Sequence, residues 1–160
     1  MPDWSVITNA LREAGIGVAS GTAPRAVGGG DISAAWRVET SDAPVFVKTG
    51  SPASADMFAA EAEGLAELAA PQAIRVPRVL ACGLEGATAF LAIEWLDFAR
   101  PTRDTEVRLG RQLAELHRTT RDRYGWHRDN TIGLTPQHND WSDDWVEFFG
   151  RQRLGFQLQL

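Results

Sequence analysis

Hydrophobic and polar positions follow two different patterns along the chain. Apolar residues recur every three or four positions in Ser5–Ala14 and in Ala53–Ala70, so both segments are predicted to be helices. Short β-branched and aromatic runs, bounded by glycine, proline or aspartate, are typical of strands. Five such strands are expected, at Ala23–Val27, Ala34–Glu39, Val45–Lys48, Val79–Cys82 and Thr88–Glu94.

The pattern becomes helical again from Asp104 onward, and Trp141–Leu160 is predicted to be a second helical stretch. The segment between them, Tyr124–Asp140, is predicted to be a loop. Five strands with one helix inserted after the third, followed by helices, predict an α+β fold rather than a βαβ repeat with a parallel sheet. A change in composition predicts two lobes, residues 1–97 and residues 98–160.

Composition and charge exclude several classes of function. The 160 residues are 44% hydrophobic, which is enough for a core, and they carry a net charge of −5. An acidic chain lacks the basic surface that nucleic-acid binding requires. The single cysteine, Cys82, excludes an internal disulfide and a cysteine-based zinc site. With no signal peptide and no long apolar run, a cytoplasmic protein without membrane contact is expected.

Three consecutive glycines, Gly28, Gly29 and Gly30, separate the first two predicted strands. Glycines allow backbone N–H groups to approach an anion closely, so this turn could cover the phosphates of a nucleotide. The turn is neither a Walker loop nor a Rossmann fingerprint, because no Gly-Lys-Ser/Thr follows and a strand comes next. Taken alone, three glycines before a strand are more often a plain hairpin turn.

Lys48 ends the third predicted strand, after the glycine-rich turn. A lysine at such a place can contact the α- and β-phosphates of a nucleotide, as it does in protein kinases. The alternative is a lysine that protects an edge strand from aggregation, and a lone lysine favours that interpretation.

Glu61 is a carboxylate within the apolar stripe of the helix predicted for Ala53–Ala70, whereas Glu63 and Glu67 fall on the opposite face. The stripe is formed by Phe58, Ala62, Leu65, Leu68 and Ala69. A carboxylate that faces a core needs a partner, because an unpaired buried charge is strongly destabilising. Lys48 is the nearest candidate, so an ion pair is expected; the alternative is that Glu61 reaches water at the edge of the stripe.

The segment Glu94–Asp97 follows the fifth predicted strand, where the hinge of a kinase would offer backbone groups to adenine. The same segment could also be a simple connector between two lobes, and the two interpretations are compatible. The ordered set of glycine-rich hairpin, strand lysine, helix glutamate and acidic-aromatic connector is more specific than any one of its members.

Several stretches of the sequence resemble the fructosamine (ketosamine) 3-kinase family. The closing segment Trp141–Phe149, with its tryptophans, paired aspartates and phenylalanines, is the most distinctive of them. The others are Val45–Lys48, Met57–Glu61, Val76–Leu80, Leu109–Arg118 and Asp129–Gln137. The resemblance covers nearly the whole chain and separates it from aminoglycoside phosphotransferases and choline kinases, which share the protein-kinase-like fold.

The resemblance implies a protein-kinase-like N-lobe, with a five-stranded antiparallel sheet and one helix, followed by the start of a helical C-lobe. It implies a transferase that uses ATP and Mg²⁺ to phosphorylate the 3-hydroxyl of ketosamines, a small-molecule substrate class, in protein deglycation. By the same resemblance Lys48 would contact the phosphates and Glu61 would hold Lys48. Gly28–Gly30 would cover the phosphates, and Glu94 and Leu96 would offer backbone groups to adenine.

Members of this family are nearly twice as long, and their catalytic loop and metal-binding Asp-Pro are expected beyond Leu160. No catalytic or metal-binding residue is therefore expected among residues 1–160. His127-Arg128-Asp129 spells the catalytic triplet of protein kinases, but the asparagine expected five positions later is Leu134. We therefore do not expect this triplet to be catalytic.

Two alternatives to the kinase remain open. One is a nucleotide-binding or scaffolding protein without transferase activity, and the weaker one is a phosphotransferase for aminoglycosides or choline-like alcohols. Apolar side chains gather in Phe148–Leu160, where they are expected to pack on the remainder of a C-lobe. If left uncovered, this surface would favour self-association.

Overall fold

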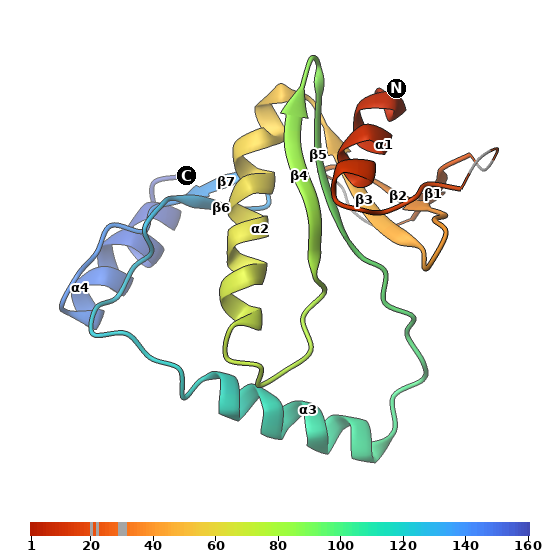
Figure 1. Cartoon of the computed structure of the whole chain (residues 1–160). Helices are drawn as coiled ribbons and strands as arrows, with labels where there is room; N and C mark the ends of the chain where they lie inside the picture. Colours follow the sequence, from red (N-terminus) through yellow and green to blue (C-terminus); the bar gives the residue numbers. More distant parts are fainter. Residues whose placement is uncertain (20, 22, 29–31) are drawn as a thin grey trace. The chain divides into compact units, whose positions relative to one another are not determined.

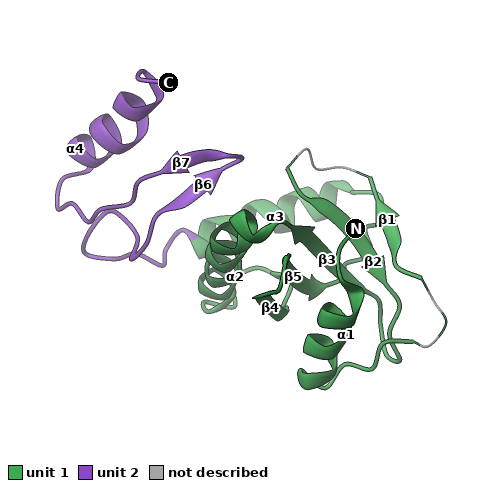
Figure 2. Ribbon diagram, turned by 90° about the horizontal axis from the view of Figure 1, so that it is seen from above, with its two compact units in different colours: residues 1–116 green, residues 117–160 purple. Residues whose placement is uncertain are grey.

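The computed structural model describes the whole chain except residues 20, 22 and 29–31. The chain forms two compact units, Met1–Leu116 and His117–Leu160, and each is described by itself (Figure 2). None of the helices in the described residues is long and apolar enough to span a membrane.

The first unit is built on a five-stranded antiparallel sheet with the order β1-β2-β3-β5-β4 (Figure 1). Its strands are β1 (Arg25–Val27), β2 (Ala34–Val38), β3 (Val45–Gly50), β4 (Val79–Glu85) and β5 (Thr88–Glu94). β5 lies between β3 and β4 and so has a partner strand on both sides, and its first five residues are all buried. This arrangement confirms the predicted α+β fold with five antiparallel strands.

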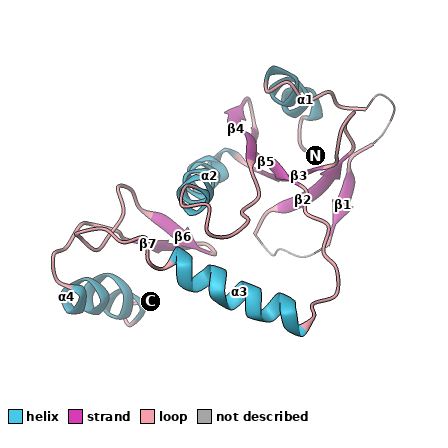
Figure 3. Cartoon of the chain, turned by 60° about the horizontal axis from the view of Figure 1, so that its bottom comes forward, coloured by secondary structure: helices cyan, strands magenta, loops and turns pink. Residues whose placement is uncertain are grey.

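Two helices cover opposite faces of this sheet, as Figures 1 and 3 show. Helix α1 (Trp4–Glu13) buries Ile7 and Leu11 against the face formed by Val38, Val45, Val47, Phe90 and Ala92. Helix α2 (Ala55–Ala69) follows a short 3₁₀ turn, η1 (Pro52–Ser54), and packs Phe58 on Ala89 and Leu91 of the other face. Alternating side chains of each strand thereby fill two apolar layers, one per face.

A third helix, α3 (Arg103–Leu116), ends the first unit and has no buried residue. Its leucines Leu109 and Leu113 are 52% and 42% exposed. The two compact units meet after residue 116, whereas the sequence predicts a boundary between two lobes after residue 97. That lobe boundary stays a prediction.

The second unit contains a small hairpin of β6 (Asn130–Ile132) and β7 (Thr135–Gln137), followed by α4 (Trp145–Phe149) and the wider helical turns of η2 (Gly150–Gly155). Asp144 is the N-cap of α4, because its side chain accepts a hydrogen bond from the backbone N–H of Glu147. The helical stretch predicted for Trp141–Leu160 therefore begins four residues later than expected.

The prediction of a loop for Tyr124–Asp140 was wrong, because this segment contains the β6–β7 hairpin. Gly133 lies in the turn between the strands with φ of +64°, a conformation that glycine adopts readily. Each strand is only three residues long, and one of the six residues is Pro136, so no alternating apolar pattern marks the hairpin in the sequence.

Candidate functional site

Lys48 projects from the face of the sheet that α2 covers. Residues directly opposite one another in antiparallel strands project to the same face. Lys48 is paired with Ala35 of β2 on one side and with Leu91 of β5 on the other. Because Leu91 packs with Phe58 of α2, the side chain of Lys48 lies on the same face.

An ion pair joins Lys48 on β3 to Glu61 on α2. The Nζ atom of Lys48 donates hydrogen bonds of 2.6 Å and 2.8 Å to the two carboxylate oxygens of Glu61. The two side chains are 28% and 31% exposed, so solvent still reaches the pair. Phe58, one turn before Glu61, is completely buried and fixes this part of α2 on the sheet. The structure thus forms the ion pair that the helix periodicity predicted.

Lys48 is also the only lysine in the sequence, and all other residues in the basic count of 16 are arginines. A strand lysine held by a helix glutamate is the arrangement with which protein kinases position the phosphates of ATP. The carboxylate of Glu61 on α2 therefore holds the positively charged ammonium group of Lys48 on β3 in position. Its role in nucleotide binding stays a prediction.

The single cysteine lies in the same row of the sheet, since Cys82 of β4 is paired with Leu91, which is paired with Lys48. Burial raises the pKa of the Cys82 thiol, and the nearby carboxylates of Glu61 and Glu63 raise it further. A thiol that holds its proton is a poor nucleophile, so Cys82 does not suggest covalent chemistry at this site.

The structure describes only part of the predicted glycine-rich turn. Gly28 directly follows β1, and a Cβ atom added at Gly28 would meet nothing within 4 Å. Gly29 and Gly30 lie outside the described residues. Since Val27 pairs with Ala35, the turn connects two antiparallel strands, as predicted. Its role as a cover for phosphates stays a prediction.

Glu94 ends β5 and is held through both its backbone and its side chain. Its N–H donates to the carbonyl of Arg78 at 2.8 Å, so the backbone group that Glu94 can offer a ligand is its carbonyl. Its carboxylate accepts from Arg75 Nη2 at 2.7 Å and from the Arg78 N–H at 3.3 Å. Desolvation alone would raise the pKa of Glu94, but these hydrogen bonds and the charges of Arg75 and Arg78 lower it overall. Leu96, the other predicted adenine contact, lies two residues beyond the strand.

Sequence reasoning missed the partners of this connector, Arg75 and Arg37. Arg75 contacts Glu94, and the Arg37 guanidinium carbon lies 4.9 Å from the ring centre of Trp95. The available signal was weak, because an arginine in a loop or on a strand is an ordinary surface residue. Only the sheet register brings β2 and the segment before β4 to the end of β5.

The triplet His127-Arg128-Asp129 belongs to the second unit, where Asp129 has hydrogen-bond partners within the fold. Its carboxylate lies 2.8 Å from Nδ1 of His138 and accepts from the Asn139 N–H at 2.9 Å. The hydrogen bonds from His138 and then from Asn139 lower the pKa of Asp129. These contacts close the β6–β7 hairpin and agree with a structural role for the triplet.

No group of three His, Cys, Asp or Glu side chains that could hold a metal ion occurs in the part of the chain that the structure describes. We derive no step through magnesium from these residues.

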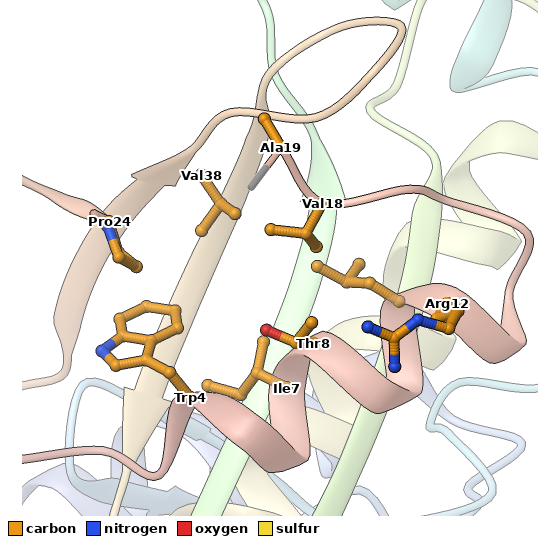
Figure 4. A pocket seen from close by; sticks show the side chains of 9 residues that line it. Trp4, Ile7, Thr8, Arg12, Val18, Ala19, Pro24 and Val38 are labelled. Atoms are coloured by element: carbon orange, nitrogen blue, oxygen red, sulfur yellow. The ribbon is translucent and has the colours of Figure 1, made fainter. Parts of the chain in front are cut away.

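A pocket of about 290 Å³ lies on the opposite, α1-covered face of the first unit (Figure 4). Buried Ile7 and Leu11 contribute to its lining, together with Trp4, Val18 and Val38, while Thr8 and Arg12 are polar residues along it. Because Lys48 projects from the other face of the sheet, where it pairs with Glu61 of α2, this pocket does not belong to the site around the ion pair.

The five-stranded sheet, the covering helix and the lysine–glutamate pair together define a protein-kinase-like fold. The family model for fructosamine kinases matches residues 3–160, and the chain belongs to this family. A solved structure from Haemophilus somnus, named "Putative fructosamine-3-kinase", superposes with a TM-score of 0.88 and 30% identity over 98% of this chain and 53% of its own. Another so named, from Thermobifida fusca, has a TM-score of 0.75 and 33% identity, over 92% of this chain and 50% of its own.

Two curated relatives are similar in sequence over most of the chain. A protein of Synechocystis sp. named "Probable ketoamine kinase" is 43% identical over 85% of this chain and 46% of its own. The chloroplastic protein-ribulosamine 3-kinase of Arabidopsis thaliana is 42% identical over 84% of this chain and 42% of its own. The chain thus spans about half the length of the curated relatives it matches.

Proposed function

We propose that this chain carries the nucleotide-binding part of an ATP-dependent kinase that phosphorylates the 3-hydroxyl of ketosamines. The observation that carries the proposal is the Lys48–Glu61 ion pair, with Nζ–carboxylate distances of 2.6 Å and 2.8 Å. Membership of the fructosamine kinase family and the names of the relatives, "Probable ketoamine kinase" and protein-ribulosamine 3-kinase, support the substrate class.

The α2-covered face offers contacts for both ends of a nucleotide. Lys48 lies three residues from Val45, which is paired with Glu94 at the start of the connector. At the rise of an extended strand, this separation is about 10 Å. Lys48 would therefore contact the phosphates while the backbone of Glu94 and Leu96 contacts the base. Gly28–Gly30, between β1 and β2, would cover the phosphates.

Under this proposal, nucleotide binding and the transfer step depend on different parts of the longer family members. Transfer needs a base for the substrate hydroxyl and carboxylates for magnesium, besides the groups that bind the nucleotide. The residues of this chain would bind and orient ATP and hold its phosphate charge. The base and the magnesium-binding carboxylates would lie in the part of the longer relatives that this chain does not span.

An ATP titration by calorimetry tests the proposal, with the wild-type chain beside Lys48→Ala and Glu61→Gln. We expect ATP binding by the wild type, loss of most affinity in Lys48→Ala, and a smaller loss in Glu61→Gln, because Lys48 keeps its charge there but loses its position. Arg12→Gln, on the α1-covered face, is the matched control and should bind like the wild type. Equal binding by the wild type and Lys48→Ala would refute the proposal.

The substrate class needs a separate assay. Fructosyl-lysine and ribulosyl-lysine should be phosphorylated by an intact protein of this family that contains the present chain, and Lys48→Ala should abolish that activity. Turnover of an aminoglycoside or of choline in place of the ketosamines would favour the alternative phosphotransferase. ATP binding without turnover of any of them would favour the binding protein without transferase activity.

A further inference from the structure

The connector Glu94–Asp97 is attached to its surroundings at both of its first two residues. Glu94 is held by the segment that precedes β4, through one backbone hydrogen bond from its own N–H and two to its carboxylate. The next residue, Trp95, is held by strands on the other side of β5. Segments that connect secondary-structure elements are generally more mobile than the elements themselves, and these contacts restrain the connector at its start.

Among the described residues, Arg37, Phe46 and Asp97 contact the side chain of Trp95. The guanidinium of Arg37 on β2 lies over its ring, with 4.9 Å between the guanidinium carbon and the ring centre. The ring of Phe46 on β3 lies 6.2 Å away, centre to centre, and the indole Nε1–H donates to Oδ1 of Asp97 at 2.9 Å. A cation–π contact of this kind strengthens as its groups lose contact with water.

The sheet register explains why these groups converge. Arg37 is paired with Phe46, and Phe46 is paired with Ile93, so all three project to one face. Trp95 comes two residues after Ile93 and lies over the same row. Lys48 comes two residues after Phe46 and therefore projects to this face as well. The groups that hold the connector thus share a face with the lysine that would bind phosphates.

Arg37 is itself fixed in direction. Its Nε atom lies 2.9 Å from Oε1 of Glu39, an ionic contact that lacks hydrogen-bond geometry. The Arg37 and Glu39 side chains are 35% and 31% exposed, so the guanidinium is partly desolvated where it meets the indole. The ion pair leaves the flat face of the guanidinium free to stack on Trp95.

We propose that Trp95, together with Arg37 and Arg75, positions the connector backbone for a purine base. These are positioning residues, because they act through the carbonyl of Glu94 and the backbone of Leu96. The inference rests on the proposed nucleotide-binding function and adds the residues on which base affinity depends. Recognition through backbone groups requires them to be ordered before the ligand binds, since ordering a loop on binding costs affinity.

The test separates base contacts from phosphate contacts by using two ligands, ATP and inorganic triphosphate, in NMR titrations of the full chain. Trp95→Ala should weaken ATP binding about tenfold, which corresponds to about 1.4 kcal/mol, and leave triphosphate affinity unchanged. Trp95→Phe keeps a ring for Arg37 and Phe46 and should recover most of the ATP affinity. Arg75→Gln should weaken ATP binding by about threefold, because the Arg75 side chain is 71% exposed.

Trp145→Ala in the second unit is the matched control for loss of an indole and should change neither affinity. If Trp95→Ala binds ATP like the wild type, or loses ATP and triphosphate equally, the positioning role is wrong while the proposed function stands. If the wild type binds neither ligand, both the positioning role and the proposed function are wrong.

Discussion

Different kinds of contact stabilise the interiors of the two compact units. In the first, apolar side chains from α1, α2 and both faces of the sheet form two buried clusters. In the second, the most buried side chain is a polar one, Asn139, which is 3% exposed. Its amide donates to the carbonyl of Arg128 and to Oδ1 of Asn130, and its own oxygen accepts from Arg153 at 2.6 Å.

The difference decides how each unit responds to substitution. Apolar burial is spread over many contacts, so removal of one side chain costs its transfer free energy and the cavity left behind. A hydrogen-bond network depends on complete pairing, so removal of one member leaves several buried groups without partners. The loss of stability in the first unit should therefore depend on the volume of the buried side chain that is removed. In the second unit it should depend on the number of hydrogen bonds that are lost.

The largest effect is expected from Phe58→Ala in the first unit. Phe58 is fully buried beneath α2, so we expect a loss of about 4 kcal/mol in the free energy of unfolding. Urea denaturation followed by tryptophan fluorescence measures it. Leu68→Ala, on the same helix but 47% exposed, should cost much less. Equal losses in the two variants would contradict the division of α2 into a buried first part, around Phe58, and an exposed end, around Leu68.

Asn139→Ala should have the second-largest effect, about 2 to 3 kcal/mol, because it removes the buried amide that bonds to Arg153 Nη2 and to the Arg128 carbonyl. Hydrogen exchange of the β6 and β7 amides reports the loss within the second unit. Asn9→Ala, which removes an exposed amide from α1, is the matched control and should change little. Unchanged exchange in β6 and β7 would show that apolar contacts hold this unit after all.

The Lys48–Glu61 pair should contribute about 1 kcal/mol to stability, since both side chains keep partial contact with water. A double-mutant cycle with Lys48→Met and Glu61→Gln measures that coupling free energy by urea denaturation. The pair would then be retained for positioning a ligand more than for folding. A coupling several times larger would place it among the main stabilising contacts of the first unit.

The smallest effect concerns pH. The pKa of Asp129 is lowered in the folded state by His138 and Asn139, so the ionised form stabilises the fold. This contribution is present above the ordinary aspartate pKa of about 3.9 and is lost as the pH falls through the lower folded value. Relative to the intrinsic exchange rate at each pH, the protection of the β6 and β7 amides should therefore decrease below about pH 4 in the wild type, and Asp129→Asn should remove that dependence. A wild-type profile identical to that of Asp129→Asn would contradict it.

The sequence predicts the first unit well because its signals are local and apolar. Short apolar runs bounded by turn residues identified all five strands, and helical periodicity identified α1 and α2 to within two residues at each end. The β6–β7 hairpin escaped because its cohesion comes from Asn139 and Arg153, and no periodic pattern records which polar side chains meet. Long-range polar contacts become visible only once the backbone is placed.

The candidate site divides in the same way. The Lys48–Glu61 pair was predictable, because a carboxylate within an apolar helix stripe needs a nearby cation. The contacts of Trp95 and Glu94 with Arg37 and Arg75 were not, because each depends on the register of strands far apart in sequence. Sequence therefore identifies the charged centre of the site, and the fold identifies the groups around it.

The central claim is that the face of the sheet bearing Lys48 binds the phosphates of ATP. An acyl-phosphate derivative of ATP transfers its acyl group to an amine next to the bound phosphates, and Lys48 offers the only lysine amine in the chain. Mass spectrometry should find the label on Lys48, with labelling suppressed by excess ATP and the amino group of Met1 as internal control. Labelling of Met1 alone, or labelling of Lys48 that ATP does not suppress, would contradict the account.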